Sequence, residues 1–280
     1  MPRLFRCLAA ALAPLTLAAP HAAAASGLPR WEAGISSAAL YAPDYRGADQ
    51  MRTRALVLPY VVYRGDVLRA DRDGLRAQLL DGQRIEFNLS AGLGLPVNSD
   101  RNDARRGMPE IDWVVELGPA MNVRLASWDG GRSDLQLRLP VRAAFALDGG
   151  ADYVGTLFTP GLRASFRDLD WARGAVLRLT TGPQFATADY HRFYYGVEPA
   201  FATPTRPAYR PGAGYSGWEA SMSLVKISGP WRLFGFGGVD LIHGAQFEDS
   251  PLIRRRSNWN VGFGVAFVIA SSGERVSYRE

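Results

Sequence analysis

The feature that most constrains the fold is an alternation of apolar and polar residues sustained far longer than ordinary strands require. Between Asp112 and Leu125 every second residue, from Trp113 onward, is apolar, while Glu116 and Arg124 belong to the opposite face. Segments 135–147 and 259–267 repeat the pattern. Period-two alternation is typical of β-strands. Soluble strands usually run about 5–6 residues, whereas a tilted strand crossing a bilayer needs about 9–11, so these lengths favour membrane-spanning strands.

The connections between the predicted strands are unequal in length. Short turns are predicted at 64–66, 81–82, 128–132, 168–173 and 228–230, and long polar loops at 42–53, 96–109, 188–213 and 244–257. Short turns at one end and long loops at the other are typical of an outer-membrane barrel, whose short turns face the periplasm. The predicted strands are 31–41, 54–64, 67–71, 74–80, 83–95, 110–126, 133–147, 152–167, 173–187, 214–228, 231–243 and 258–268.

We therefore predict an all-β fold, an antiparallel transmembrane β-barrel of twelve strands. Segment 67–80 is the weak point, because its two halves are too short to span a bilayer. If it is one bulged strand or an excursion at the rim, the count becomes ten or an odd number. A soluble β-sandwich would also alternate and is the alternative fold.

The first 25 residues have the pattern of a secretory signal peptide. Arg3 and Arg6 form a positive region, residues 8–19 are apolar, and Ala23 and Ala25 suit cleavage before residue 26. The expected mature chain, 26–280, is a single barrel domain with a periplasmic tail at 268–280, reached by Sec-type export to the outer membrane of a Gram-negative cell. It retains 30 basic and 27 acidic residues, for a net charge of +3, and has no cysteine.

Composition excludes several classes of protein. No apolar run of about 18 residues follows the N-terminal segment, which excludes a bundle of transmembrane helices. With 11% aromatic residues the chain has enough apolar surface to fold, which excludes an intrinsically disordered protein. A charge of +3 without a basic stripe predicts no nucleic-acid partner. Glycine-rich stretches 235–238 and 262–264 lie inside strands with no following helix, so no nucleotide cofactor is expected.

If the apolar faces meet lipid, the opposite faces line the lumen. In segment 231–243 this assignment is ambiguous, because Phe234 and Phe236 conflict with Trp231 and Leu233. Inward arginines outnumber inward acids. Two interpretations remain open, an Arg–acid network that braces a small barrel and a narrow passage that prefers anions. The lumen candidates are Glu86, Glu116, Arg124, Arg138, Arg142, Arg163, Arg178, Glu219, Arg232 and Asp240.

Catalytic and metal sites are not expected. His191 and His243 are the only histidines after the signal, and without cysteine they make a transition-metal site improbable. A set formed by His243, Ser250 and Glu248 or Asp249 at the outer rim is the one enzymatic alternative. Tryptophans are predicted in an interfacial girdle at the short-turn ends: Trp31, Trp128, Trp171, Trp231 and Trp259.

Four short segments, in order along the chain, carry a resemblance to a known family. They are Tyr41 to Asp49 (YAPDYRGAD), Leu58 to Tyr60 (LPY), Phe193 to Val197 (FYYGV) and Asp249 to Ile253 (DSPLI). Together they resemble the MltA-interacting protein / OmpV family of outer-membrane proteins over nearly the whole mature chain. Two departures are Ala48 in place of the usual serine and a chain that continues 13 residues beyond Phe267.

The resemblance implies a non-enzymatic outer-membrane barrel without catalytic residues. Its implied role is a scaffold that joins a lytic transglycosylase to a murein synthase in the periplasm, in contact with outer-membrane lipid and lipopolysaccharide. Other members of the family are adhesins or antigens, so a surface adhesin is a second alternative beside the narrow channel.

Overall fold

The computed structural model describes residues 28–64, 68–71, 74–77, 84–170 and 172–276. The predicted signal peptide and much of the turns at 64–66 and 81–82 lie outside these ranges. The barrel wall is built from β2 (Trp31–Pro43), β3 (Met51–Arg64), β4 (Leu68–Asp71), β5 (Gly74–Ala77), β6 (Ile85–Gly94), β7 (Val114–Trp128), β8 (Ser133–Ala146), β9 (Asp152–Phe158), β10 (Gly161–Leu169), β11 (Ala172–Ala186), β12 (Gly214–Ser228), β13 (Trp231–Leu241) and β14 (Ser257–Ser271).

These strands form one antiparallel sheet in which most sequence neighbours pair and β14 returns to pair with β2. The hydrogen-bonded path runs from β5 through β2 and β14 to β6, and its two ends, β5 and β6, contact each other. β9 and β10 share one place in the wall, between β8 and β11. The predicted antiparallel barrel is therefore confirmed, with twelve strands on the path, of which β4 and β5 have only four residues each.

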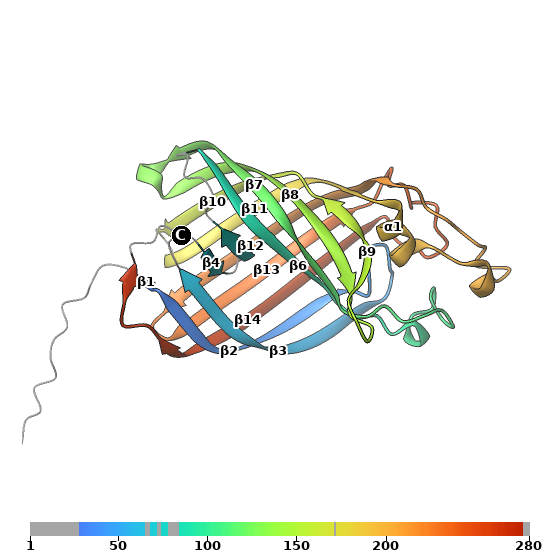
Figure 1. Cartoon of the computed structure of the whole chain (residues 1–280), viewed down its shortest axis with the longest axis horizontal. Helices are drawn as coiled ribbons and strands as arrows, with labels where there is room; N and C mark the ends of the chain where they lie inside the picture. Colours follow the sequence, from blue (N-terminus) through green and yellow to red (C-terminus); the bar gives the residue numbers. More distant parts are fainter. Residues whose placement is uncertain (1–27, 65–67, 72–73, 78–83, 171, 277–280) are drawn as a thin grey trace, which may run out of the picture.

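The two ends of the barrel differ as the loop lengths predicted. The long loops and the short helix α1 (Ala188–Tyr195) lie at one end, and the short turns and the described chain ends lie at the other (Figure 1). At the short-turn end, β1 (Leu28–Pro29) pairs with β15 (Arg275–Val276). None of the described helices is long and apolar enough to cross a membrane.

Several strand boundaries differ from the sequence prediction. Segment 152–167 is interrupted at Thr159 and Pro160, because proline has no N–H to continue the ladder. Thr159 N–H still donates to the Pro140 carbonyl (3.2 Å), which keeps β9 and β10 in line. β7 begins at Val114 rather than at residue 110, and β14 continues to Ser271, past the predicted end at 268.

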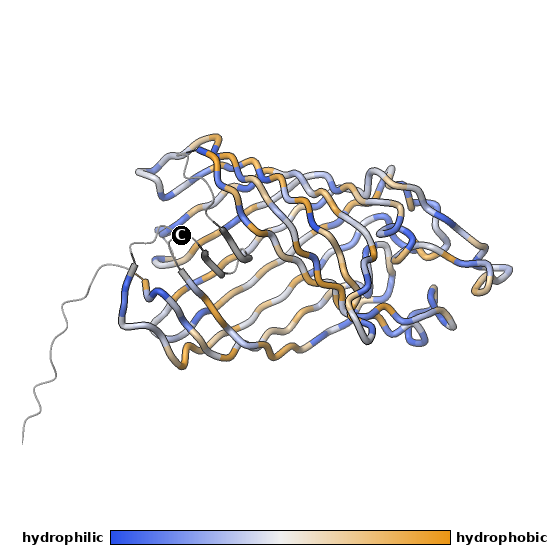
Figure 2. Tube along the Cα trace, in the orientation of Figure 1, coloured by the Kyte–Doolittle hydropathy of each residue, from blue (hydrophilic) through white to orange (hydrophobic). Residues whose placement is uncertain are grey.

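Exposure alternates along the strands and settles the ambiguous strand β13. Leu233 and Val239 are exposed on the outer surface, whereas Arg232 and Asp240 are buried. Phe234 and Phe236 share the inner face with these charges, each over a glycine of β14 where an added Cβ would overlap the ring. The large exposed side chains of the outer surface, with Phe263 at 70%, match a wall that faces lipid. Figure 2 shows apolar and polar residues alternating along the wall.

The predicted tryptophan girdle is wrong at one position. Trp31, Trp128 and Trp231 lie at the short-turn end, where Trp231 packs on Phe267 with ring centroids 4.7 Å apart. Trp259 lies at the opposite end, since β14 begins directly after a long loop, and it packs against Tyr41. Trp171 is outside the described residues. Aromatic side chains therefore occur at both ends of the wall, as expected for two membrane interfaces.

Candidate functional site

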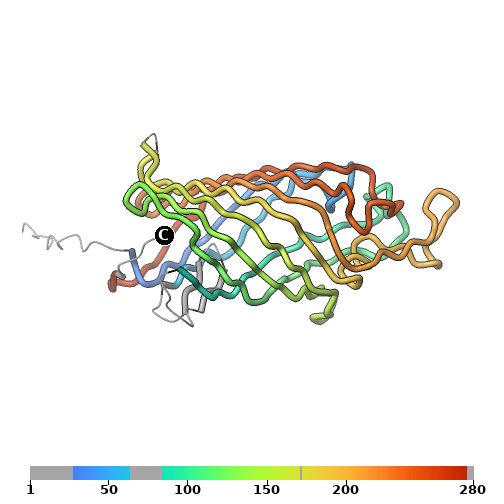
Figure 3. Tube along the Cα trace, turned by 90° about the horizontal axis from the view of Figure 1, so that it is seen from above, coloured from blue at the N-terminus to red at the C-terminus, as the bar shows by residue number. Residues whose placement is uncertain are grey.

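Four long loops fold together over the outer end of the barrel, and we call them the loop cap: residues 44–50, 95–113, 187–213 and 242–256. Figures 1 and 3 show them gathered at this end. They share one buried hydrophobic core, whose largest members include Tyr45, Val97, Ile111, Tyr195, Phe247 and Leu252. The loops arise from separate places around the wall, so they can share a core only by crossing the mouth of the barrel.

Ring stacking and two hydrogen bonds fix the centre of the loop cap. The rings of Tyr195 and Phe247 stack with centroids 3.6 Å apart and planes 8° from parallel. Tyr45 Oη donates to the Leu252 carbonyl (2.7 Å), and Ser250 Oγ donates to the Tyr195 carbonyl (2.7 Å). Burial raises the pKa of Tyr195 to about 12, so its hydroxyl stays neutral.

Ser250 is therefore a structural residue of the cap. It is buried and its hydroxyl bonds the Tyr195 carbonyl, whereas His243 is exposed and no hydrogen bond joins the two. His243 Nδ1 lies 4.0 Å from Glu248 Oε1, beyond hydrogen-bond distance. The described residues thus do not assemble the catalytic set considered from the sequence. They also hold no group of three or more metal-ligating side chains.

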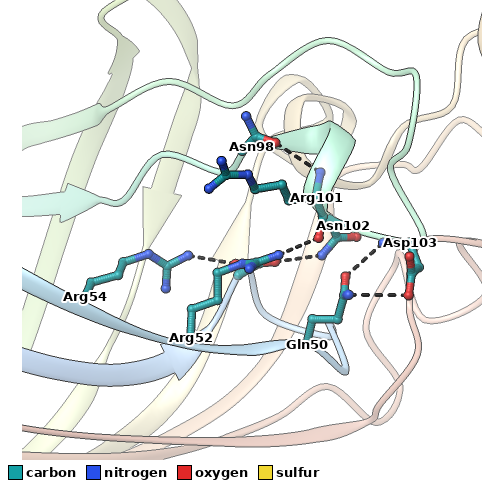
Figure 4. A network of polar contacts seen from close by, with 8 residues as sticks. Gln50, Arg52, Arg54, Asn98, Arg101, Asn102 and Asp103 are labelled. Carbon is teal, nitrogen blue, oxygen red and sulfur yellow. Dashed lines mark hydrogen bonds and ion pairs between the residues drawn. The ribbon is translucent and has the colours of Figure 1, made fainter.

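An ionic cluster around Asp44 ties the first loop of the cap to the second (Figure 4). The buried Asp44 carboxylate accepts from Arg52 Nε (2.9 Å) and Arg54 Nη2 (2.8 Å) through one oxygen and from Asn102 Nδ2 (2.9 Å) through the other. Charge-assisted bonds of this kind are stronger than neutral ones. Because Arg52 and Arg54 belong to β3 and Asn102 to the loop after β6, the cluster anchors the cap to the wall.

His191 also holds the cap to the wall, a role that its sequence position alone did not indicate. It is completely buried on α1, with Nδ1 2.6 Å from the Gly212 carbonyl and Nε2 2.6 Å from Ser216 Oγ. Burial lowers the pKa of His191. The ring is therefore neutral, with Nδ1–H donating to the carbonyl and Nε2 accepting from the serine hydroxyl.

Beneath the cap, Arg46 reaches from the first loop into the lumen, where it joins the predicted lumen residue Asp240 directly and Glu219 through Gln184. Its Nε donates to Asp240 Oδ1 (2.7 Å) and its Nη1 to Gln184 Oε1 (2.6 Å). Gln184 Nε2 in turn bonds the Glu219 carboxylate. Arg46 thus connects the cap to β11, β12 and β13.

A second cluster pairs Glu116 with Arg142, on the neighbouring strands β7 and β8. Arg142 Nε lies 3.0 Å from Glu116 Oε2, and Tyr190 Oη donates to Glu116 Oε1 (3.3 Å) from α1. Arg142 Nη1 also lies 3.4 Å from Ser90 Oγ. The helix of the cap is therefore bonded to the same lumen cluster.

A third cluster lies near the periplasmic end. Arg232 pairs with Glu32, with Nη2 and Nε at 2.9 and 3.0 Å from Oε2, and the two side chains are 6% and 0% exposed. Tyr60 Oη donates to the same carboxylate oxygen (3.2 Å). Arg232 Nη1 donates to the Gly229 carbonyl (2.7 Å), which fixes the β12–β13 turn.

The remaining predicted lumen residues lie between these clusters. Arg138 Nε donates to Asn122 Oδ1, and Arg163 Nε to Thr180 Oγ1, both at 3.4 Å. Three others are placed by register: Glu86 lies opposite Asn122, Arg124 opposite Gln136, and Arg178 opposite Ser165 and Ser223. Arg124 is exposed, unlike its buried neighbour Asn122. The ten predicted residues therefore occupy separate levels of the barrel rather than one site.

Comparison with solved structures finds outer-membrane proteins at very low identity. A FadL homologue from Pseudomonas aeruginosa is 11% identical with a TM-score of 0.34, and covers 86% of this chain and 68% of its own. The outer membrane protease OmpT from Escherichia coli is 8% identical with a TM-score of 0.36, covering 85% and 95%. A bacterial polysaccharide outer membrane secretin is 7% identical with a TM-score of 0.38, covering 85% and 99%.

Comparison with known sequences identifies the family. Outer membrane protein Omp26La of Vibrio anguillarum and outer membrane protein OmpV of Vibrio cholerae are each 24% identical over 209 residues, or 73% of this chain and 75% of theirs. The family described as "MltA-interacting protein MipA" matches residues 21–269. With a match over most of its length, the chain belongs to the MipA family and is an outer-membrane β-barrel protein.

Proposed function

We propose that this protein is a non-enzymatic scaffold that holds peptidoglycan-processing enzymes at the outer membrane. The observation that carries the proposal is the family match over residues 21–269, since the family is described by its interaction with MltA, a lytic transglycosylase. A murein synthase is the expected second partner, and lipid and lipopolysaccharide surround the wall. A small-solute channel and a surface adhesin are the competing functions.

The loop cap and the ion pairs of the lumen favour the scaffold function and argue against a wide channel. The cap crosses the mouth, Arg142 and Arg232 each join two strands through a carboxylate, and Arg46 joins the cap to β13 through Asp240. Such bonds brace the wall and fill the space that an open pore needs. A scaffold needs a firm body in the membrane and a contact surface in the periplasm.

The turns β7–β8 and β10–β11 offer such a surface. They are neighbours, because β8 pairs with β10 and Arg167 N–H donates to the Arg132 carbonyl (2.9 Å). Arg132, Asp168, Asp170 and Arg173 are exposed here and line a cavity of about 350 Å³. A patch with both charge signs suits a polar, reversible protein contact. The turn at 228–230 and the residues after Ser271 complete the proposed surface.

Affinity purification tests the proposal. Tagged protein from detergent-solubilised outer membranes should recover a lytic transglycosylase or a murein synthase. The variant Arg132→Glu/Arg173→Glu should lower this recovery at least about tenfold, because two rim charges are reversed. Arg254→Glu/Arg255→Glu, which reverses two exposed charges of the loop cap at the opposite end, is the matched control and should recover as much partner as the unmodified protein.

Two results would contradict the scaffold. The first is recovery of the barrel alone in repeated purifications under mild detergent. The second is partner recovery that is equal for the turn variant and the unmodified protein, which would place the contact elsewhere. Planar-bilayer recording serves as the test of the channel: discrete, anion-selective conductance from purified protein would favour that alternative.

A further inference from the structure

The loop cap carries a groove that no assigned role explains. It has a volume of about 860 Å³ and lies between residues 105–110, the start of β9, α1 and residues 196–210. We call it the cap groove. Its apolar lining is supplied by Met108, Tyr153, Phe193, Phe201 and Tyr209. This volume and this lining are typical of sites for small organic molecules.

A buried cation without a carboxylate partner forms part of the lining. Arg105 is only 3% exposed, and its guanidinium donates to Ser99 Oγ (3.2 Å), the Tyr194 carbonyl (3.1 Å) and the Pro109 carbonyl (3.1 Å). All three acceptors are neutral. Its Cζ also lies 5.9 Å from the centroid of the Tyr45 ring. Burial lowers the pKa of Arg105, which reflects a charge that its surroundings do not compensate.

The other charged residues near the groove do not fully compensate the positive charge of Arg105. Asp189 is engaged by Arg192 within α1, and Glu198 is exposed to solvent. Glu110, also exposed, raises the pKa of Arg105 but offsets the effect of burial only in part. Arg206 bonds the carbonyls of residues 104, 106 and 201 and no carboxylate. The loop cap therefore holds two guanidinium groups bonded only to neutral acceptors, the buried Arg105 and the half-buried Arg206.

We propose that the cap groove binds a small organic carboxylate with an apolar, preferably aromatic, body. Of the five N–H donors of Arg105, the three bonds above leave two, and a carboxylate is the group whose geometry and charge suit a guanidinium. The apolar body lies against Phe193, Phe201 and Tyr209. The loop cap faces the cell exterior, so the ligand comes from the medium. This proposal does not depend on the scaffold function.

Calorimetric titration of the protein in nanodiscs tests the proposal with two matched probes, phenylacetate and its neutral amide, phenylacetamide. Heats from empty nanodiscs of the same lipid are subtracted. We expect saturable binding of phenylacetate with a Kd at or below about 1 mM and binding of the amide at least about tenfold weaker. Absence of phenylacetate binding at ten times that concentration, or equal binding of both probes, overturns the proposal.

Variants test whether binding depends on Arg105 or only on non-specific contact with the apolar lining of the groove. Arg105→Met should weaken phenylacetate binding at least about tenfold, and Arg105→Lys, which keeps the charge and loses the planar fork, by less. Arg210→Glu places a negative charge on the exposed lining without touching the core and should also weaken binding. Arg254→Met, outside the groove, is the control. Unchanged binding in both Arg105→Met and Arg210→Glu would refute the site, whatever the stability of the first variant.

Discussion

The buried ion pair at the periplasmic end allows a quantitative test of how the lumen network stabilises the barrel. Arg232→Met removes the guanidinium that approaches Glu32 Oε2 at 2.9 and 3.0 Å and leaves a carboxylate with no exposed surface. Breaking one side of such a pair costs about 3–5 kcal/mol, because the remaining carboxylate stays buried without its cationic partner. The lost bond to the Gly229 carbonyl adds about 1 kcal/mol. We therefore expect the free energy of unfolding to fall by about 4–6 kcal/mol.

Urea unfolding in lipid vesicles, followed by tryptophan fluorescence, measures this change. The double variant Glu32→Leu/Arg232→Met removes both charges, so it should recover most of the loss and lie within about 2 kcal/mol of the unmodified protein. Arg173→Met, at an exposed turn, is the control and should cost less than about 0.5 kcal/mol. A loss under about 1 kcal/mol in Arg232→Met would show that solvent in the lumen already screens the pair. A double variant as unstable as the single one would show that the loss does not come from the buried carboxylate.

Two further predictions concern the loop cap. Phe247→Ala removes a fully buried ring from the cap core and should cost about 3–5 kcal/mol of local stability; limited proteolysis should cut the loops faster while the wall stays resistant, and unchanged cleavage would contradict a shared core. Because burial lowers the pKa of His191 below its ordinary value of 6.5, the unfolded cap takes up a proton below that pH and the folded cap does not. Cap stability should therefore fall as pH decreases from about 6.5 toward the folded pKa, and His191→Gln should remove this dependence of the proteolysis rate, whereas an unaltered pH profile in the variant would assign it to another group.

The wall was predictable from the sequence because burial there follows one simple rule. Lipid meets every second residue, so β7, β8 and β14 show their period in the residue types alone. The rule failed where the inner face is also apolar. In β13, Phe234 and Phe236 face the lumen because glycines of β14 leave room for them, and only the pairing register reveals this contact. The break at Pro160 likewise depends on the strands on either side.

The lumen charges were predictable individually, but their partners were not. Alternation identified Arg232 and Asp240, yet Glu32 escaped notice because the first strand is rich in Ala and Ser and alternates weakly. Arg46 was missed because it belongs to a loop, and loops carry no period. Asp44 and Asn102 lie far apart in the sequence and meet only when the loops fold over the mouth. Long-range ion pairs of this kind need the register of the whole sheet.

Most of the segments that carry the family resemblance fold into the loop cap. Three of the four, 41–49, 193–197 and 249–253, contribute to the loop cap, and they supply Tyr45, Tyr195 and Leu252 to its core. A wall strand tolerates any apolar residue on its lipid face, whereas the cap needs particular shapes and donors, such as Ser250 bonding the Tyr195 carbonyl. The proposed enzyme contacts and the proposed carboxylate site lie at opposite ends of the barrel, so the two can fail separately. Cap variants that lose phenylacetate binding should still recover the periplasmic partners, and simultaneous loss of both in a folded barrel would require the braced lumen to couple the two ends.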